Sequence, residues 1–150
     1  MGLALAGLSA PAGAQGVSDA ELIASARQAC ADRDFNGFMS NFARNTRVQA
    51  AFLAPSIEVR SLAAPARIIS TVEAARYGNA FAIAMVDYSW VDARTARGRN
   101  PADLRLTWTE LPDSGQRIDY VRPAARGANR AGAYVFAFRG GCWQLVQDLR

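Results

Sequence analysis

The spacing of apolar residues changes once along the chain, and this change limits the fold more than any other feature. In the first third, apolar side chains recur every three or four residues, as in Phe35, Phe38, Met39 and Phe42. This is the repeat of a helix with one buried face. From Ser56 onward, many apolar residues instead alternate with polar ones, which is the repeat of strands. Helices followed by a run of strands predict an α+β domain with a mostly antiparallel sheet.

Three helices are expected before the strands begin. Ser18 and Glu21 form a capping box at the start of the first, because each side chain accepts a hydrogen bond from the other residue's backbone amide. A second helix is expected after Asp34 and a short third one after Asn45. Pro55 ends the helical part, since proline cannot donate the hydrogen bond that a helix interior requires.

The remaining sequence predicts a series of strands. These are "SIEVRSL", "RIISTVEA", "FAIAMVDYSWV", "LRLTWT", "RIDYVR", "AYVFAF" and "CWQLVQDL". The third, residues 81–91, is apolar on both sides and is therefore expected to be a central strand covered on both faces. The turn residues "PDSG" are expected to join the fourth and fifth strands as a hairpin.

Residues 1–14 resemble the end of a secretory signal peptide. A short run of Leu, Ala and Gly leads to Ala12, Gly13 and Ala14, a pattern that a signal peptidase cuts. The alternative is a disordered leader. The run is too short to span a bilayer, so we expect no transmembrane segment. Residues 15–150 are then expected to form a single domain that is periplasmic or secreted, with a cytoplasmic location as the alternative.

The two cysteines, Cys30 and Cys142, are expected to form a disulfide, because an exported domain with an even cysteine count favours pairing. The bond would tie the first helix to the last strand. Two separate buried thiols are the alternative. Strict alternation places Cys142 on the face opposite Trp143, so the bond needs a bulge at Gly140 and Gly141 or a position before the strand begins.

The composition removes several kinds of chemistry. The chain has no histidine and no lysine, and its 17 basic residues are all arginine. The absence of histidine excludes the Ser-His-Asp and Cys-His arrangements. With only two cysteines besides, zinc sites built on thiolate or imidazole are excluded as well. We therefore expect no metal site and no cofactor, and any catalysis must use Asp, Glu, Tyr, Arg or Ser.

Two loops concentrate positive charge. Their arginines are Arg94, Arg97 and Arg99 in the first loop, and Arg122, Arg126 and Arg130 in the second. If the loops meet at one end of the sheet, they would attract a phosphate, a membrane surface or an anionic polymer. Neither loop has the interleaved aromatic residues that stack on bases, so nucleic acid is not the expected partner and solvated loops are the favoured interpretation.

The order of elements, together with the closing "GCWQLVQD", resembles the nuclear transport factor 2-like (SnoaL-like) superfamily over residues 18–150. The resemblance implies a cone-shaped, cystatin-like fold in which N-terminal helices pack on a curved sheet and leave a pocket at the wide end. Members include isomerases, dehydratases and binding modules, and no shared catalytic motif carries over. The resemblance also implies that a homodimer can form through the outer sheet face, for which the aromatics of "AYVFAF" would be suited.

Alternation along the predicted hairpin selects candidate ligand-binding residues. Trp108 and Glu110 share one face of the first strand, and Tyr120 and Arg122 share one face of the second. We expect the four side chains to lie on the same side of the sheet. An ion pair between Glu110 and Arg122 is then either a rim salt bridge, which is favoured, or a polar anchor for a ligand.

Asp87 is a further candidate, because it lies on the face of the expected central strand that also carries Ile83 and Met85. A buried carboxylate must be hydrogen-bonded or have a shifted pKa, so it is a candidate general base. A salt bridge to an arginine or a bond to backbone at a bulge is the favoured structural explanation. In the catalytic explanation, Tyr120 would act as the proton donor beside Asp87.

These observations favour an exported, non-catalytic domain that binds a small apolar ligand or a partner. The alternative is an isomerase- or dehydratase-like enzyme that uses Asp87 or Glu110 with Tyr120 in an apolar pocket. A binder of acidic polymers, driven by arginine, is the third hypothesis.

Overall fold

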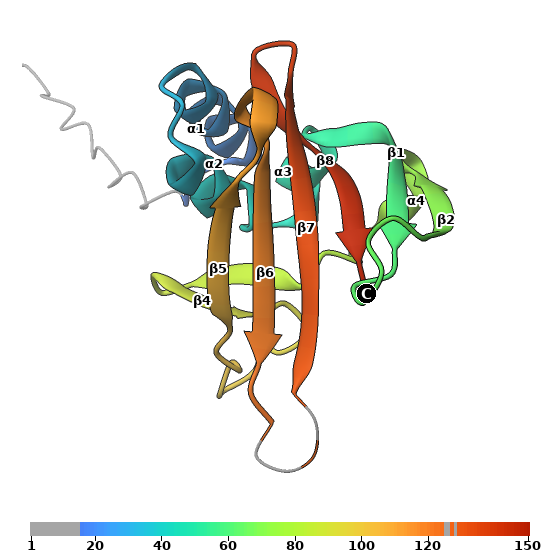
Figure 1. Ribbon diagram of the computed structural model, residues 1–150. Helices are drawn as coiled ribbons and strands as arrows, with labels where there is room; N and C mark the ends of the chain where they lie inside the picture. Colours follow the sequence, from blue (N-terminus) through green and yellow to red (C-terminus); the bar gives the residue numbers. More distant parts are fainter. Residues whose placement is uncertain (1–15, 125–126, 128) are drawn as a thin grey trace, which may run out of the picture.

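The computed structural model describes residues 16–124, 127 and 129–150 (Figure 1). The expected leader, residues 1–14, and Arg126 of the second arginine loop lie outside the described residues. The described elements form the expected α+β arrangement, in which the N-terminal helices pack on a curved and mostly antiparallel sheet.

The three expected helices are present, and local side-chain caps begin each of them. Helix α1 spans Asp19–Ala31, α2 spans Phe35–Phe42 and α3 spans Thr46–Ala50. The capping box of α1 is complete, with Ser18 N donating to Glu21 Oε2 at 2.7 Å and Glu21 N donating to Ser18 Oγ at 3.2 Å. The side chains of Asp34 and Asn45 accept backbone hydrogen bonds at the starts of α2 and α3, without the reciprocal bond of a capping box. Residues close in sequence therefore determine where these helices begin.

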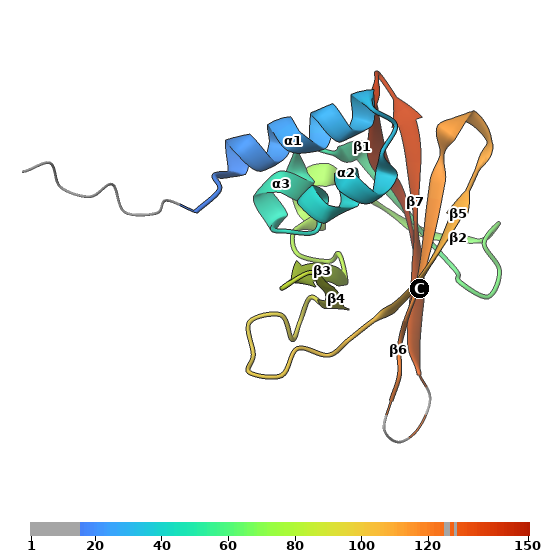
Figure 2. The same ribbon diagram turned by 90° about the vertical axis from the view of Figure 1, so that its left-hand side faces the viewer.

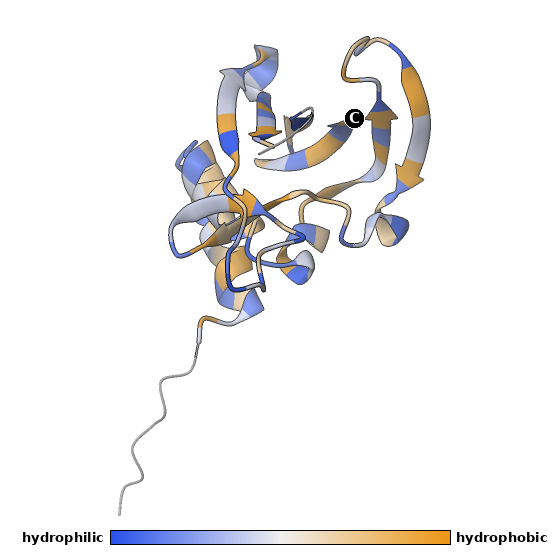
Figure 3. Ribbon diagram, turned by 90° about the horizontal axis from the view of Figure 1, so that it is seen from below, coloured by the Kyte–Doolittle hydropathy of each residue, from blue (hydrophilic) through white to orange (hydrophobic). Residues whose placement is uncertain are grey.

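The main sheet has six strands in the order β2-β1-β8-β7-β6-β5, and the strand pairs are antiparallel except for the parallel β1–β8 pair. The bounds are Leu53–Arg60 for β1, Ile68–Glu73 for β2, Arg105–Glu110 for β5, Gln116–Arg122 for β6, Arg130–Arg139 for β7 and Cys142–Leu149 for β8. A short helix α4, Ala74–Tyr77, follows β2, and a 3-10 turn η1, Pro112–Ser114, joins β5 to β6. Figure 3 shows hydrophobic and hydrophilic residues alternating along the strands.

The prediction of one central strand over residues 81–91 is wrong. The segment folds into a separate hairpin of β3, Ile83–Val86, and β4, Ser89–Asp92. Asp87 and Tyr88 form its turn with φ angles of 46° and 62°, and two consecutive positive φ angles are typical of a tight hairpin turn. The segment is apolar on both sides because the hairpin contacts both layers: Met85 N donates to Ala43 O beside α2, and Trp90 packs against Trp108 of β5.

The core lies between the helices and the sheet. Figure 2 shows α1, α2, α3 and the β3–β4 hairpin on the same side of the sheet. Phe38 of α2 contacts Phe136 of β7 and Trp143 of β8, with ring centroids 5.9 and 5.5 Å apart. Because Tyr134 and Phe136 are buried in this interior, the expectation that the aromatics of "AYVFAF" supply an outer contact face is wrong. Val135 and Ala137 occupy the alternate positions instead.

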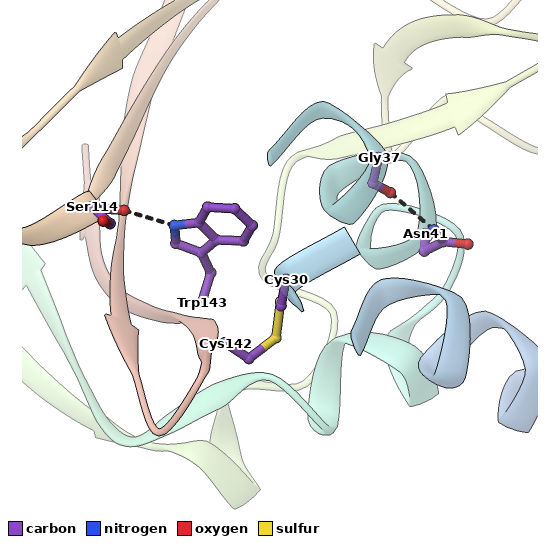
Figure 4. The surroundings of a disulfide bond; sticks show 6 residues. All are labelled: Cys30, Gly37, Asn41, Ser114, Cys142 and Trp143. Atoms are coloured by element: carbon purple, nitrogen blue, oxygen red, sulfur yellow. Dashed lines mark hydrogen bonds between the residues drawn. A yellow bond between two sulfur atoms is a disulfide. The ribbon is translucent and has the colours of Figure 1, made fainter. Parts of the chain in front are cut away.

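A disulfide joins Cys30 in α1 to Cys142 in β8 (Figure 4). Gly140 and Gly141 have φ angles of 60° and 85° and form a two-residue turn between β7 and β8. Cys142 is therefore the first residue of its strand, opposite Arg139, and it reaches the helix from the end of the sheet. This resolves the conflict with strict alternation without a bulge at the two glycines.

Within the described part of the chain, no helix combines the length and the apolar character that crossing a membrane requires.

Candidate functional site

A cavity of about 500 Å³ lies at the end of β6, β7 and β8 that is farthest from the disulfide. Its volume is in the range of small-molecule sites. The segments before β3 and after β4 form the other wall. The lining residues are Asn79, Ala80, Ala82, Asp92, Arg94, Leu104, Tyr120, Arg122, Arg130, Ala131, Tyr134, Asp148 and Arg150.

A bulge in β8 turns Asp148 into this cavity. Leu145 pairs with Phe136 and Gln147 pairs with Val135, which leaves Val146 as an extra residue between them. An extra residue reverses the alternation of the side chains that follow it. Asp148 therefore faces inward opposite Tyr134 and is only 1% exposed.

Two neighbouring groups hold the Asp148 carboxylate. The Tyr77 hydroxyl donates to Oδ2 at 2.9 Å, and Arg150 donates through Nε to Oδ1 at 3.2 Å and through Nη2 to Oδ2 at 2.9 Å. Burial and the nearby Asp148 charge raise the pKa of Tyr77, and the hydrogen bond to Asp148 raises the pKa of Arg150. The carboxylate is thus already neutralised within the protein.

Asp92, which is 4% exposed, is held in a similar way on the opposite wall. Arg122 Nη1 donates to its Oδ2 at 2.7 Å, and the backbone amide of Arg94 donates to its Oδ1 at 3.0 Å. The second contact is an Asx turn, in which an aspartate accepts from the amide two residues later. Asp92 therefore shapes the start of the first arginine loop and also neutralises one arginine of the second.

Tyr120 and Tyr134 complete the cavity wall, and Tyr77 is buried beside Asp148. The Tyr134 hydroxyl accepts a hydrogen bond from Ala82 N at 2.8 Å, and the Tyr120 ring stacks on the Tyr134 ring with centroids 5.5 Å apart. Tyr120 lies across Gly132, where an added Cβ would come within 2.6 Å of the Tyr120 Cζ atom. Burial raises the pKa of Tyr120 and, more strongly, that of Tyr134. Together with Tyr77, they are neutral phenols at physiological pH.

The two arginine loops meet at this cavity through their flanking residues, since Arg94, Arg122 and Arg130 all line it. Arg122 and Arg150 are paired with Asp92 and Asp148. Among the described residues, the side chains of Arg94 and Arg130 have no acidic partner. The wall therefore carries an excess of positive charge, together with the hydroxyl groups of Tyr120 and Tyr134.

Of the four ligand-binding candidates from the sequence, Tyr120 and Arg122 line the cavity and Trp108 and Glu110 do not. Trp108 is 37% exposed and packs edge-on against Phe35.

The predicted hairpin is present, and its register places Glu110 opposite Gln116. Six residues therefore separate Glu110 from Arg122 along the strand direction, or roughly 20 Å at the usual rise of a strand. The prediction of a Glu110–Arg122 ion pair is wrong, because Arg122 pairs with Asp92 instead.

The catalytic candidates are not brought together either. Asp87 is exposed in the turn of the β3–β4 hairpin, so the expectation that it lies on a buried strand face is wrong. Neither Asp87 nor Glu110 is a lining residue of the cavity that contains Tyr120.

Sequence reasoning missed Asp92 and Asp148. For Asp92 the sequence does contain a recognisable signal, because an aspartate directly after an apolar run is typical of an Asx turn. Asp148 left none, because alternation without the bulge at Val146 places it on the outer face.

In residues 16–124, 127 and 129–150, no group of three or more acidic, cysteine or histidine side chains is arranged to hold a metal ion.

The sequence matches no protein-family model and no curated protein sequence.

Proposed function

We propose that this chain is an exported domain that binds a small organic molecule in the cavity and leaves it chemically unchanged. The observation that carries this proposal is the state of the two lining carboxylates. Asp92 and Asp148 are each bonded to an arginine, so neither is free to act as a general base. Burial raises the pKa of Tyr120 and Tyr134, so both phenols keep their protons at physiological pH. Such a wall is suited to holding a ligand that accepts hydrogen bonds.

The location rests on the disulfide. Cys30 and Cys142 are bonded to each other, and disulfides persist in oxidising compartments such as the bacterial periplasm or the extracellular space. We therefore propose a periplasmic or secreted protein. The helices packed across a curved sheet, with a cavity beyond them, also support the proposed relation to the nuclear transport factor 2-like superfamily.

Native mass spectrometry of the full chain, secreted into the periplasm of a bacterial host, tests this function. We expect a retained small molecule that disappears under denaturing conditions. Ala82→Phe, which fills the cavity from its wall, should abolish the adduct. Asn79→Trp should do the same from the rim, because Asn79 is exposed and also lines the cavity.

Ala24→Phe on the exposed side of α1 is the matched control and should keep the adduct. An adduct that survives both cavity substitutions would place the ligand elsewhere and refute the proposal. Wild-type protein that leaves the host without any adduct would also count against it.

A further inference from the structure

We propose that the ligand of this cavity is an organic carboxylate with a flat apolar body, whose acid group is bound by Arg94 and Arg130. This inference rests on the proposed binding function and adds the chemical class of the ligand. It is carried by the charges on the wall and by the cross-strand pairing at its rim.

The charges on the cavity wall do not balance. Four arginines and two aspartates line it, which leaves two positive charges in excess. The aspartates are buried and each is bonded to one arginine, Asp92 to Arg122 and Asp148 to Arg150. The excess therefore resides on Arg94 and Arg130. A concave wall with charge of one sign attracts ligands of the opposite sign.

Arg130 stands directly opposite Arg122 across the β6–β7 pair, and both side chains belong to the cavity wall. Like charges directly opposite each other on neighbouring strands are destabilising. The Asp92 carboxylate neutralises the charge of Arg122 and so reduces this repulsion. A bound anion would neutralise the charge of Arg130 in the same way.

Arg94 reaches the same region from the opposite wall. Its backbone amide donates to Asp92 Oδ1 at 3.0 Å, and Arg94 and Tyr120 line the same cavity. One ligand can therefore contact both residues. Both Arg94 and Arg130 are exposed at the cavity rim, where a carboxylate keeps part of its hydration.

The half-buried Tyr120 ring is held by stacking on the buried Tyr134 ring at an interplanar angle of 19°, and it offers a fixed, flat group for the body of the ligand. Flat apolar groups pack on aromatic faces. Leu104 and Ala82 line the same cavity. The cavity thus has a charged rim and apolar lining residues. A ligand whose carboxylate lies at the rim and whose ring system lies inside fits this arrangement.

Isothermal titration calorimetry with 2-naphthoate and 2-naphthamide tests the inference, because the two molecules have nearly the same shape and differ in charge. We expect wild-type protein to bind the naphthoate at least tenfold more tightly than the amide. Replacing both rim arginines, in Arg94→Gln/Arg130→Gln, should reduce this preference to less than threefold and leave the affinity for the amide unchanged. Arg97→Gln/Arg99→Gln, which removes two exposed arginines of the same loop that do not line the cavity, should keep the full preference.

Equal affinity for the two molecules, with both lost in Asn79→Trp, would overturn the carboxylate inference while the proposed binding function stands. A preference that survives Arg94→Gln/Arg130→Gln, or that disappears in Arg97→Gln/Arg99→Gln, would show attraction by the general surface and would also overturn it. Binding of neither molecule overturns it as well. The proposed function is then judged separately by the adduct retained on export.

Discussion

The Asp148 carboxylate shows how a charge is tolerated in the interior of this domain. Removing a carboxylate from water costs several kcal/mol unless hydrogen bonds and an opposite charge replace the lost hydration. Tyr77 and Arg150 supply both from two different parts of the chain. Tyr77 must keep its proton to donate this bond. The protonation of Tyr77 is therefore coupled to the burial of the Asp148 carboxylate.

The buried tyrosines predict a loss of stability at alkaline pH. Burial raises the pKa of Tyr77 and Tyr134 above the ordinary value, which is about 10. Below that pH, the contribution of these two protonated tyrosines to the free energy of unfolding is fully present. Above it, tyrosines of the unfolded chain release protons that the folded chain retains, so each lowers the free energy of unfolding by about 1.4 kcal/mol per pH unit. Urea unfolding between pH 8 and roughly pH 11.5, a range chosen to span that ordinary value, measures this slope.

Tyr88→Phe provides the control, because it removes the 96% exposed tyrosine and keeps Tyr77, Tyr120 and Tyr134. In this variant, phenolate absorbance should rise together with the loss of secondary structure and not before it. A phenolate signal that appears while the far-ultraviolet circular dichroism is still native would contradict the assignment of buried, protonated phenols.

At the scale of elements, local signals predicted the helices well. Ser18, Asp34 and Asn45 all cap helices where the sequence places them, because a cap depends on residues within one turn. The hairpin around "PDSG" followed in the same way from its turn residues. The disulfide partners followed from the cysteine count and the expected compartment.

The β3–β4 hairpin and the bulge in β8 were not predicted, because each depends on tertiary packing. The turn at Asp87 and Tyr88 has no glycine to mark it, and the run around it is apolar since two layers contact it. The bulge at Val146 has no sequence signal, yet it decides that Asp148 faces the cavity. The candidate site was therefore only half predicted. Tyr120 and Arg122 belong to β6, which pairs with both neighbours without a register shift, whereas Asp148 follows the bulge in β8.

The hairpin turn predicts a stabilising substitution. Tyr88 has a φ angle of 62° and is 96% exposed, so its side chain strains the turn and buries little surface. Tyr88→Gly should raise the free energy of unfolding by about 0.5–1 kcal/mol, because glycine adopts this conformation without a Cβ clash. Tyr88→Ala keeps the Cβ atom and should bring no such gain, as measured by thermal unfolding. An equal gain in both variants would show that the backbone is not strained there.

At the scale of the whole molecule, the disulfide closes a loop between residues 112 positions apart. Such a cross-link limits the unfolded chain and stabilises the folded one by about 4–5 kcal/mol at most. Reduction with dithiothreitol should therefore lower the free energy of unfolding by roughly 3–5 kcal/mol in urea titrations. The double variant Cys30→Ala/Cys142→Ala should be equally weakened and should not respond to the reductant. Wild-type protein that is indifferent to reduction would contradict this role.

The position of β8 between β1 and β7 determines when the domain can fold during synthesis. β8 is the last of the described strands to emerge, yet it supplies the partner of β1, the buried Trp143 and one half of the disulfide. Until it arrives, β1 and β2 have no connection to the rest of the sheet. Strands β5, β6 and β7 can pair without it, but the full sheet and the disulfide are completed only after β8 has been made. The last step of folding therefore follows the synthesis of almost the whole domain.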